Sequence, residues 1–289
     1  MTQTWTPHSG GWRLHVVHET GFAYDGLARA SHNEARLTPA ALPTQSVLTT
    51  ELRVKPTAGR SSYRDYWGNR VVAFQLDEPH ASLEVTCEST VETSAAQAPF
   101  GVLGRSELSS GPVADLMDEL LAATPPTRLD GELIASVAEV TRDLDPHEAA
   151  AQVSEIVRSL LTYVSGATSV QTTATEAIAV GKGVCQDFTH VGLGLLRGIG
   201  IPARYVSGYL YPKDGVDPGE TTEGESHAWI DYFAGEWNAL DPTSGAEVGP
   251  RHVVVARGRD YNDAAPLKGI YHGAPVGSLG VTVAMTRLT

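Results

Sequence analysis

The spacing of apolar residues changes once along the chain, and the change separates a strand-rich part from a part that begins with helices. Four early segments alternate apolar and polar positions with the two-residue period of a half-buried strand. They are Trp12 to His18, Val47 to Val54, Val71 to Gln75 and Ala81 to Val91. Because turn-forming residues lie between these segments, the pattern predicts an antiparallel sheet or sandwich.

Beyond residue 112 the apolar positions recur at helical spacing. Asp145 and Pro146 are typical of a helix start, since Asp caps free N–H groups and Pro fits the first turn. The predicted helices are residues 113–123, 149–164 and 175–180, and then the stretch from Gly181 to Gly200. Further strands are expected at residues 203–210, 227–233, 236–240, 252–256 and 279–287.

Helices followed by strands, without strand–helix alternation, indicate an α+β fold. We expect an N-terminal β-sandwich-like domain at residues 1–100 and a core at 101–289, joined by a linker at 92–112. The sequence leaves open whether the last strand belongs to the core or returns to the N-terminal sheet. The acidic stretch 211–225 predicts a mobile loop, and whether it is a lid or only a hairpin tip stays open.

The composition and charge of the chain indicate which kinds of partner and which location to expect. The 289 residues carry 21 basic and 34 acidic side chains, a formal net charge of −13, which argues against nucleic acid or an anionic membrane as a partner. The first residues, MTQTWTPHSGGWRL, lack the pattern of a signal peptide, and two cysteines do not make a disulfide framework. We expect a cytoplasmic location and no cofactor. The charge favours a neutral or basic peptide or protein substrate, and the oligomeric state is not predicted.

Candidate chemistry centres on Cys185. It follows a Gly-Lys-Gly turn and begins an apolar helix that ends near Gly198 and Gly200. In the first turn of a helix, free N–H groups and the positive end of the dipole favour a thiolate, which is the nucleophilic form. Cys87, in the middle of a predicted strand, is expected to be a buried structural residue.

His227 and Asp241 are the expected partners of this thiol. If the turn Ala234–Glu236 holds three residues, Phe233 pairs with Trp237, and Asp241 shares a face of the hairpin with His227. A two-residue turn would place Asp241 on the other face. The odd turn therefore predicts an imidazole oriented by a carboxylate beside the nucleophile.

Other residues near these motifs have weaker chemical signals. Four residues could line a groove or hold an oxyanion: Tyr205, Tyr209, Trp229 and Arg259. Aromatic residues at strand spacing are more often core, and Arg259 is expected to brace the site through an Arg–Asp pair. Asp187 and His190 are expected to pack or cap the Cys185 helix. No His, Cys or Asp set shows metal-ligand spacing, so no metal site is predicted.

The three motifs resemble a known family. The segments GKGVCQDFTHVGLGLLRGIGIPARYVSGYL (181–210), ESHAWIDYF (225–233) and WNALDPTSG (237–245) resemble the core of the transglutaminase-like superfamily of papain-like thiol enzymes. Residues 14–91 resemble the N-terminal β-domain of bacterial transglutaminase-like proteins, and 252–266 also look like this family. The resemblance implies Cys185 as nucleophile, His227 as general base and acid, and Asp241 as its orienting partner.

The implied function is cysteine-dependent acyl transfer on peptide or carboxamide bonds, with a peptidase- or amidase-type hydrolase as the expected reaction. Two alternatives stay open. One is a protein-glutamine transglutaminase, in which an amine replaces water as the second nucleophile. The other is a non-catalytic binding or scaffold protein that keeps the papain-like fold.

Overall fold

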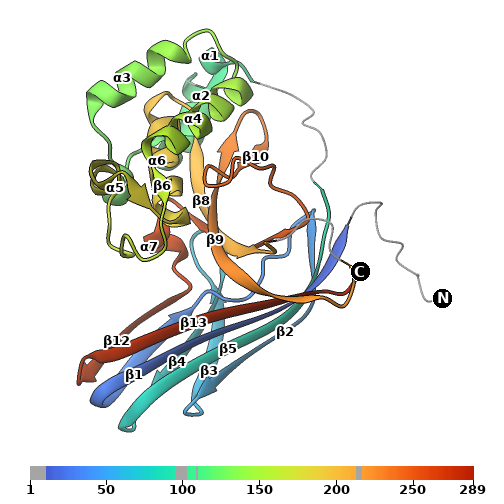
Figure 1. The fold of residues 1–289 in the computed structure, drawn as a ribbon, viewed down its shortest axis with the longest axis vertical. Helices are drawn as coiled ribbons and strands as arrows, with labels where there is room; N and C mark the ends of the chain where they lie inside the picture. The colour runs from blue at the N-terminus through green and yellow to red at the C-terminus, as the bar shows by residue number, and fades with distance from the viewer. Residues whose placement is uncertain (1–10, 96–102, 109, 213–216) are drawn as a thin grey trace, which may run out of the picture.

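The computed structural model describes residues 11–95, 103–108, 110–212 and 217–289. Strands fan out in the lower part of Figure 1, and the helices gather at the opposite end around a second group of strands. The lower part begins with β1 (Trp12–Ala35), β2 (Gln45–Lys55), β3 (Gly59–Arg64), β4 (Arg70–Leu76) and β5 (His80–Thr93). The fold is α+β, as the sequence predicts.

The upper part carries the helices and the strands that follow them. The helices are α1 (Arg105–Leu108), α2 (Gly111–Leu121), the 3-10 turn η1 (Pro125–Thr127), α3 (Gly131–Val140), α4 (Pro146–Leu160), α5 (Ala174–Val180), α6 (Cys185–Gly198) and α7 (Tyr261–Ala264). Its strands are β6 (Thr162–Tyr163), β7 (Lys182–Gly183), β8 (Ala203–Leu210), β9 (Thr221–Phe233), β10 (Trp237–Leu240) and β11 (His252–Gly258). The last two strands, β12 (Leu267–Gly273) and β13 (Val276–Arg287), return to the lower part beside β1 (Figure 1).

Strand β1 organises the β-rich part because its two halves belong to different layers. Its first half pairs with β5 and β13, and its second half pairs with β4 and β12. Between the halves the register shifts and Ala30 adopts a left-handed φ of 49°. The inner faces of the two layers enclose a buried apolar cluster that includes Leu52, Phe74 and Cys87.

Strand β9 is shared by the two parts of the molecule. Its first residues, 221–224, pair with β13, and residues 225–232 pair with β8. Figure 1 shows this strand curving from the core down into the lower sheet. Since β13 also pairs with β1, the last strand of the chain joins the N-terminal sheet to the core through β9.

Helix α6 lies at the centre of the core. It packs against α4 and α5 and against strands β8 and β9, and every residue from Gln186 to Arg197 is buried. Gly194 lets η1 approach closely, because a Cβ there would collide with the Thr127 carbonyl oxygen. A helix buried on all sides gives its first residue a fixed position.

Arg197 fixes the other end of this helix. Its guanidinium donates to the carbonyl oxygens of Ala203 (2.9 Å) and Arg259 (2.6 Å), and the side chain is buried. Burial lowers its pKa to about 10, so the group still carries its charge at neutral pH. The charge is therefore solvated by backbone dipoles rather than by water.

Two buried amides join the β-rich part to β11. Gln45 accepts from Val254 N–H (2.8 Å) and donates to Val254 C=O (2.8 Å). Asn69 makes the same pair of bonds with the backbone of Arg257, at 2.8 and 2.7 Å. Each amide acts like a residue of a neighbouring strand, so the two parts are held in one orientation.

Several expectations need correction. The polar stretch 211–225 is not one loop, because residues from Thr221 onward belong to β9; its residues 213–216 lie outside the described part. The central residues of the predicted linker, 96–102, and the start of the chain, 1–10, are also outside it. Strands β3 and β12 and helix α3 were not predicted.

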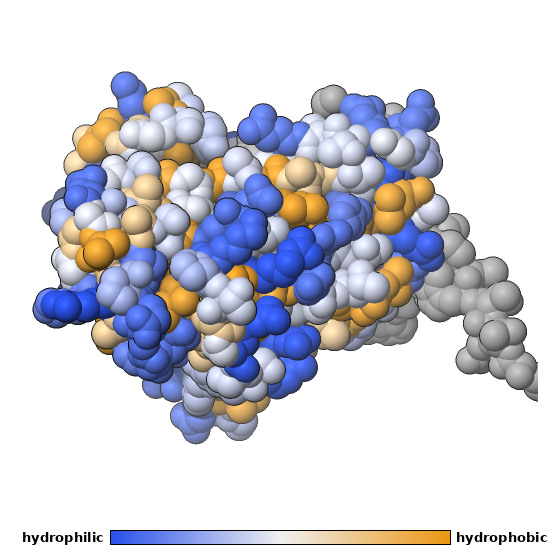
Figure 2. Space-filling view, turned by 90° about the horizontal axis from the view of Figure 1, so that it is seen from below, coloured by the Kyte–Doolittle hydropathy of each residue, from blue (hydrophilic) through white to orange (hydrophobic). Residues whose placement is uncertain are grey.

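Among the described residues, no helix is long and apolar enough to cross a membrane. Seen from below, apolar side chains lie among hydrophilic ones without forming one large patch (Figure 2).

Candidate functional site

Cys185 is the first residue of α6 and is partly exposed. The preceding residues set this position, because Gly181 ends α5 in the left-handed region (φ 69°) and turns the chain toward α6. Within the described residues, neither the Cys185 N–H nor the Gln186 N–H donates to another group. These free donors lie at the positive end of the helix dipole, where they favour negative charge.

Asp187 caps the helix, as predicted. Its Oδ2 atom accepts from the Val184 N–H (2.8 Å) and from the Thr168 hydroxyl (2.6 Å). Burial raises the pKa of this carboxyl. His190 packs inside the core, where its Nε2 accepts from the Tyr261 N–H (3.2 Å), and burial lowers its pKa to about 4. Both side chains therefore position α6.

The β9–β10 hairpin has the odd register that the sequence predicts. Phe233 pairs with Trp237, which leaves the three residues 234–236 in the turn. Asp241 follows the last pair and comes onto the face that carries His227 and Trp229. The prediction of this register is confirmed.

His227 and Asp241 form a buried hydrogen-bonded pair. His227 Nε2 lies 3.0 Å from Asp241 Oδ2, and both side chains are nearly inaccessible to solvent. Asp241 also accepts from the Ser244 hydroxyl (2.7 Å) at Oδ2 and from the Thr243 N–H (2.9 Å) at Oδ1. It is thus both a turn former and the partner of His227, and the turn fixes the carboxylate.

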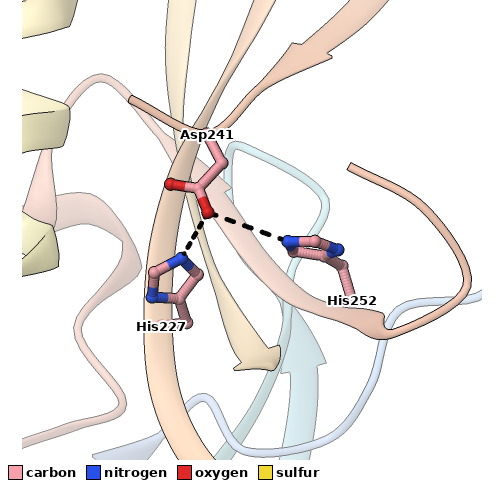
Figure 3. Close-up of side chains that lie close together, drawn as sticks. All are labelled: His227, Asp241 and His252. Atoms are coloured by element: carbon pink, nitrogen blue, oxygen red, sulfur yellow. Dashed lines mark hydrogen bonds and ion pairs between the residues drawn. The ribbon is translucent and has the colours of Figure 1, made fainter. Parts of the chain in front are cut away.

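Cys185 lies close to the start of the segment that carries His227. Its sulfur lies 4.0 Å from the carbonyl oxygen of Ser226, the residue before His227. Figure 3 shows the other ring nitrogen, Nδ1, turned away from Asp241. Because Nε2 is engaged with the carboxylate, Nδ1 is the atom left to interact with the sulfur.

The charges of these groups are coupled. Burial alone would lower the pKa of His227, but the hydrogen bond to Asp241 and the neighbouring Cys185 sulfur outweigh burial and raise it to about 10. Burial likewise opposes ionisation of Asp241, yet its hydrogen bonds with His227 and Ser244 and the nearby His252 imidazole hold its pKa well below the usual range. At neutral pH the pair is therefore an imidazolium and a carboxylate.

His252 is the residue that the sequence reasoning missed. Its Nε2 lies 4.0 Å from Asp241 Oδ2, on the side away from His227 (Figure 3), and the side chain is buried. Gly249 N–H donates to its Nδ1 (3.2 Å), so neutral His252 carries its proton on Nε2, facing the carboxylate. Burial lowers its pKa, which favours this neutral form. The only sequence signal was its place at the start of a predicted strand.

These same three side chains could hold a metal ion, since one ligand atom from each lies within 4.8 Å of the others. The set fits zinc in its chemistry, with two imidazoles and a carboxylate. A metal would have to displace the proton that joins His227 to Asp241. The expected absence of a metal site stays a prediction.

The predicted groove-lining aromatic residues lie in the core instead. Tyr205, Tyr209 and Trp229 are 2%, 3% and 0% exposed. Tyr209 donates to Leu37 C=O (3.4 Å), and the Trp229 ring lies edge-on to His252 with centroids 5.2 Å apart. Burial, and then the charge of Cys185, raise the pKa of Tyr205.

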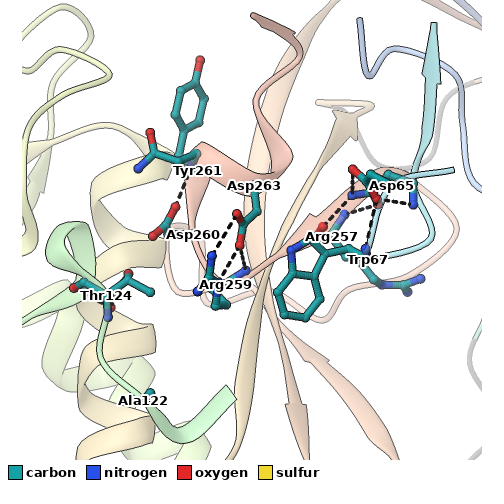
Figure 4. Close-up of polar contacts among 12 residues, drawn as sticks. Asp65, Trp67, Ala122, Thr124, Arg257, Arg259, Asp260, Tyr261 and Asp263 are labelled. Carbon is teal, nitrogen blue, oxygen red and sulfur yellow. Dashed lines mark hydrogen bonds and ion pairs between the residues drawn. The ribbon is translucent and has the colours of Figure 1, made fainter. Parts of the chain in front are cut away.

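Arg259 forms the Arg–Asp pair expected of a bracing residue, but its partner is Asp263 and not the adjacent Asp260. Its Nε donates to Asp263 Oδ2 (2.9 Å), and its backbone N–H donates to the same oxygen (Figure 4). The guanidinium also lies 5.8 Å from the ring centroid of Trp67. It therefore connects α7 to the β-rich part rather than reaching Cys185.

Comparisons with known proteins identify the family of this chain. The model of the bacterial transglutaminase-like N-terminal region matches residues 14–92, and that of the transglutaminase-like superfamily matches 135–242. An uncharacterized protein of Mycobacterium leprae is 42% identical over 277 residues, which cover 96% of this chain and 99% of that protein. The chain belongs to the transglutaminase-like superfamily.

Other members extend the comparison. An uncharacterized protein of Mycobacterium tuberculosis is 34% identical over 92% of this chain and 90% of its own length. A crystal structure described as a "Putative Cysteine Protease from Cytophaga hutchinsonii" superposes with a TM-score of 0.72 at 22% identity, covering 96% of this chain and 93% of that one. At that identity the likeness shows a shared fold, which includes the N-terminal β-domain.

Proposed function

We propose that this member of the superfamily is a cysteine-dependent acyl-transfer enzyme that hydrolyses peptide or carboxamide bonds. The observation that carries the proposal is the 3.0 Å contact between His227 Nε2 and Asp241 Oδ2, which leaves Nδ1 of a protonated imidazole beside the Cys185 sulfur. A cation held there stabilises a thiolate, and the free N–H groups at the start of α6 add to this effect.

The reaction follows from these positions. The Cys185 thiolate attacks the carbonyl carbon, and the Cys185 and Gln186 N–H groups hold the oxyanion of the tetrahedral intermediate. His227 gives its proton to the departing amine as the C–N bond breaks, which leaves a thioester on Cys185. Water then attacks the thioester while His227 takes a proton from it, and the C–S bond breaks, which releases the carboxylic acid and returns Cys185 to the thiolate.

Site-resolved alkylation tests the nucleophile. With iodoacetamide at neutral pH, Cys185 should react far faster than Cys87, which is buried and whose pKa is raised by burial. His227→Ala should slow the labelling of Cys185 and leave that of Cys87 unchanged. Equal and slow labelling of both residues would favour the scaffold alternative.

The second nucleophile needs a separate measurement. Peptide libraries incubated with and without a primary amine distinguish new carboxylates from new amide products by mass. Hydrolysis products that persist in the presence of amine support the proposed hydrolase. Amide products formed at the expense of hydrolysis would assign the chain to amine transfer instead.

A further inference from the structure

Strand β9 leaves β13 just before it reaches the candidate site, and the two strands form a fork. Their last pair is Gly224 with Val283, and beyond it β9 pairs with β8 instead (Figure 1). Near the other end of this pairing the Arg287 N–H donates to Glu220 C=O (3.2 Å), so even-numbered residues of β9 direct their backbone groups toward β13. The Ser226 carbonyl therefore points into the fork.

The Cys185 sulfur lies in this fork. It is 4.0 Å from the Ser226 carbonyl oxygen, on the side of β9 to which that carbonyl points. Ser226 is exposed and Cys185 is partly exposed, so the fork is open to solvent at this point. A peptide that enters the fork would therefore pass the sulfur.

Strand β13 keeps an unpaired edge beyond the point where β9 leaves it. On its opposite edge the Leu288 N–H donates to Arg13 C=O (2.7 Å), and the ladder with β1 has no shift from residue 14 to residue 23. Even-numbered residues of β13 therefore bond to β1, and odd-numbered ones face the fork. Leu279 and Val281 thus direct their N–H and C=O groups to the open edge, where neither bonds to another described residue.

The sequence of this edge does not discourage pairing. Free edges of natural sheets usually carry charged side chains or proline, which keep another strand from adding, but residues 276–286 contain neither. The side chains of Leu279 and Val281 are 57% and 48% exposed. They lie on the face of the sheet that buries Met285 against the core, because alternate residues share a face. The edge therefore combines free backbone groups with uncovered apolar side chains, which suits an extended peptide.

We propose that the open edge of β13 binds an extended segment of the peptide substrate as an added antiparallel strand, in line with β9. The inference rests on the proposed function for the identity of the peptide as substrate, whereas the binding itself does not. The peptide backbone pairs with Leu279 and Val281, and alternate apolar side chains of the peptide pack on theirs. Because backbone pairing is independent of sequence, the apolar side chains set the preference.

This arrangement places the bond that is cut on the N-terminal side of the bound segment. An antiparallel peptide has its N-terminal end nearest Val283, where β9 already occupies the edge. The residues before this point must leave β13 and follow β9 past Ser226 and the Cys185 sulfur. The bound segment is thus the part of the substrate that departs with the new amino group.

N-methylated peptides test the pairing without catalysis. The full chain with Cys185→Ala is titrated with a short fluorescein-labelled peptide of alternating Leu and Ser. In the proposed register the Leu residues of the peptide lie opposite Leu279 and Val281 and bond to them. N-methylation of the peptide's Leu residues should therefore raise the Kd by about 10-fold or more. N-methylation of its Ser residues, whose N–H groups face away from β13, should have little effect.

Val281→Pro tests the same pairing from the side of the protein. Proline removes the N–H that faces the fork and takes no bond from the ladder with β1, so the fold should be retained. The Kd of the unmethylated peptide should rise by about 5- to 10-fold, and Leu279→Pro should act in the same way. Val281→Thr is the matched control, because it keeps the N–H and the branched shape, and it should change the Kd much less. Urea unfolding checks the stability of all three variants.

Several outcomes would overturn the added strand. One is a loss of binding on methylation of Ser that equals or exceeds the loss on methylation of Leu. Another is an unchanged Kd in Val281→Pro and Leu279→Pro. A dimer in sedimentation velocity that Val281→Pro dissociates would also overturn it, because the edge would then pair with a second copy of the chain.

The two proposals fail separately. Rapid labelling of Cys185, together with peptide binding that methylation of Leu does not change, removes the binding edge and keeps the enzyme. Binding that requires the N–H groups of the peptide's Leu residues, together with an inert Cys185, removes the enzyme and leaves a peptide-binding edge.

Discussion

His252 Nε2 lies 4.0 Å from the same Asp241 oxygen to which His227 is hydrogen-bonded. Two imidazoles thus face one carboxylate atom, one protonated and close, the other neutral and at the limit of an electrostatic contact. A neutral N–H directed at a carboxylate stabilises its charge without competing for the proton that His227 holds. Because His227 is closer than His252 to the shared oxygen, Asp241 acts mainly as the partner of His227.

The first prediction concerns this second imidazole. His252→Leu removes the N–H and should lower kcat/KM by about 5-fold, the loss of one weak electrostatic contact with the Asp241 carboxylate. His252→Gln, which keeps an N–H in a similar place, should recover most of the rate. Because Asp241 loses a donor, the acid limb of the kcat/KM profile should move to higher pH in the Leu variant. Equal loss in both variants, with no change in the acid limb, would indicate a purely structural role.

Asp241→Asn tests the orienting carboxylate. The amide keeps the shape but not the charge, so the imidazolium loses its main stabiliser and the thiolate loses its cation. We expect alkylation of Cys185 and kcat/KM to fall by about 10²- to 10⁴-fold while the fold is retained. Circular dichroism checks the fold. A variant with unchanged alkylation would show that the carboxylate does not act through His227.

The raised pKa of His227 also predicts a dependence of stability on pH. In a Cys185→Ser background the thiol does not titrate, so the remaining shift comes mainly from Asp241. A folded pKa that Asp241 holds above the ordinary 6.5 gives stability that is fully present below pH 6.5 and is lost as pH rises through the folded pKa. The free energy of unfolding should therefore fall between pH 7 and 10 more steeply than in Cys185→Ser/His227→Gln. Urea unfolding at a series of pH values measures the free energy of unfolding of both variants. If that free energy depended on pH in the same way in both, the raised pKa of His227 would be contradicted.

Gly208 supports the site from the neighbouring strand. It lies opposite His227 in the β8–β9 ladder, and a Cβ there would lie 2.5 Å from the Trp229 ring. Gly208→Ala should cost about 1–3 kcal/mol of unfolding free energy through overpacking and should slow the alkylation of Cys185. Gly21→Ala is the control, because a strand position with no atom within 4 Å of the added Cβ should tolerate it. Similar destabilisation of both variants would exclude the steric explanation.

A chelator tests whether the His227, Asp241 and His252 set needs an ion. Since Asp241 is already bound by His227 and Ser244, we expect full activity after dialysis against EDTA. Loss of activity that added zinc restores would show that the set is a metal site.

Local signals in the sequence were sufficient for the elements that carry the site. Asp145 and Pro146 marked the start of α4, and the turn at Ala234–Glu236 determined that Asp241 would face His227. These features depend on residues close together in sequence, where periodicity and turn length fix the geometry.

What the sequence did not predict depends on distant partners. The residues from Thr221 form a strand only because β13 lies beside them, and their polar, acidic composition indicates a loop. His252 acts through a contact with Asp241 that no spacing reveals. Aromatic residues such as Trp229 and Tyr209 show the same strand alternation whether they lie in the core or line a groove. Only the layers that pack on the strands decide which of the two they do.

The shared strand β9 has a consequence for how this protein can be divided. The polypeptide that positions His227 is continuous with the segment that completes the lower sheet through β13 and β1. Trimming away the N-terminal half would leave β12 and β13 without their partner β1, and β13 is the strand on which the start of β9 pairs. The smallest unit that keeps these strands paired is accordingly both halves together, and recombining the core with a β-domain from another member would require exchanging β13 as well.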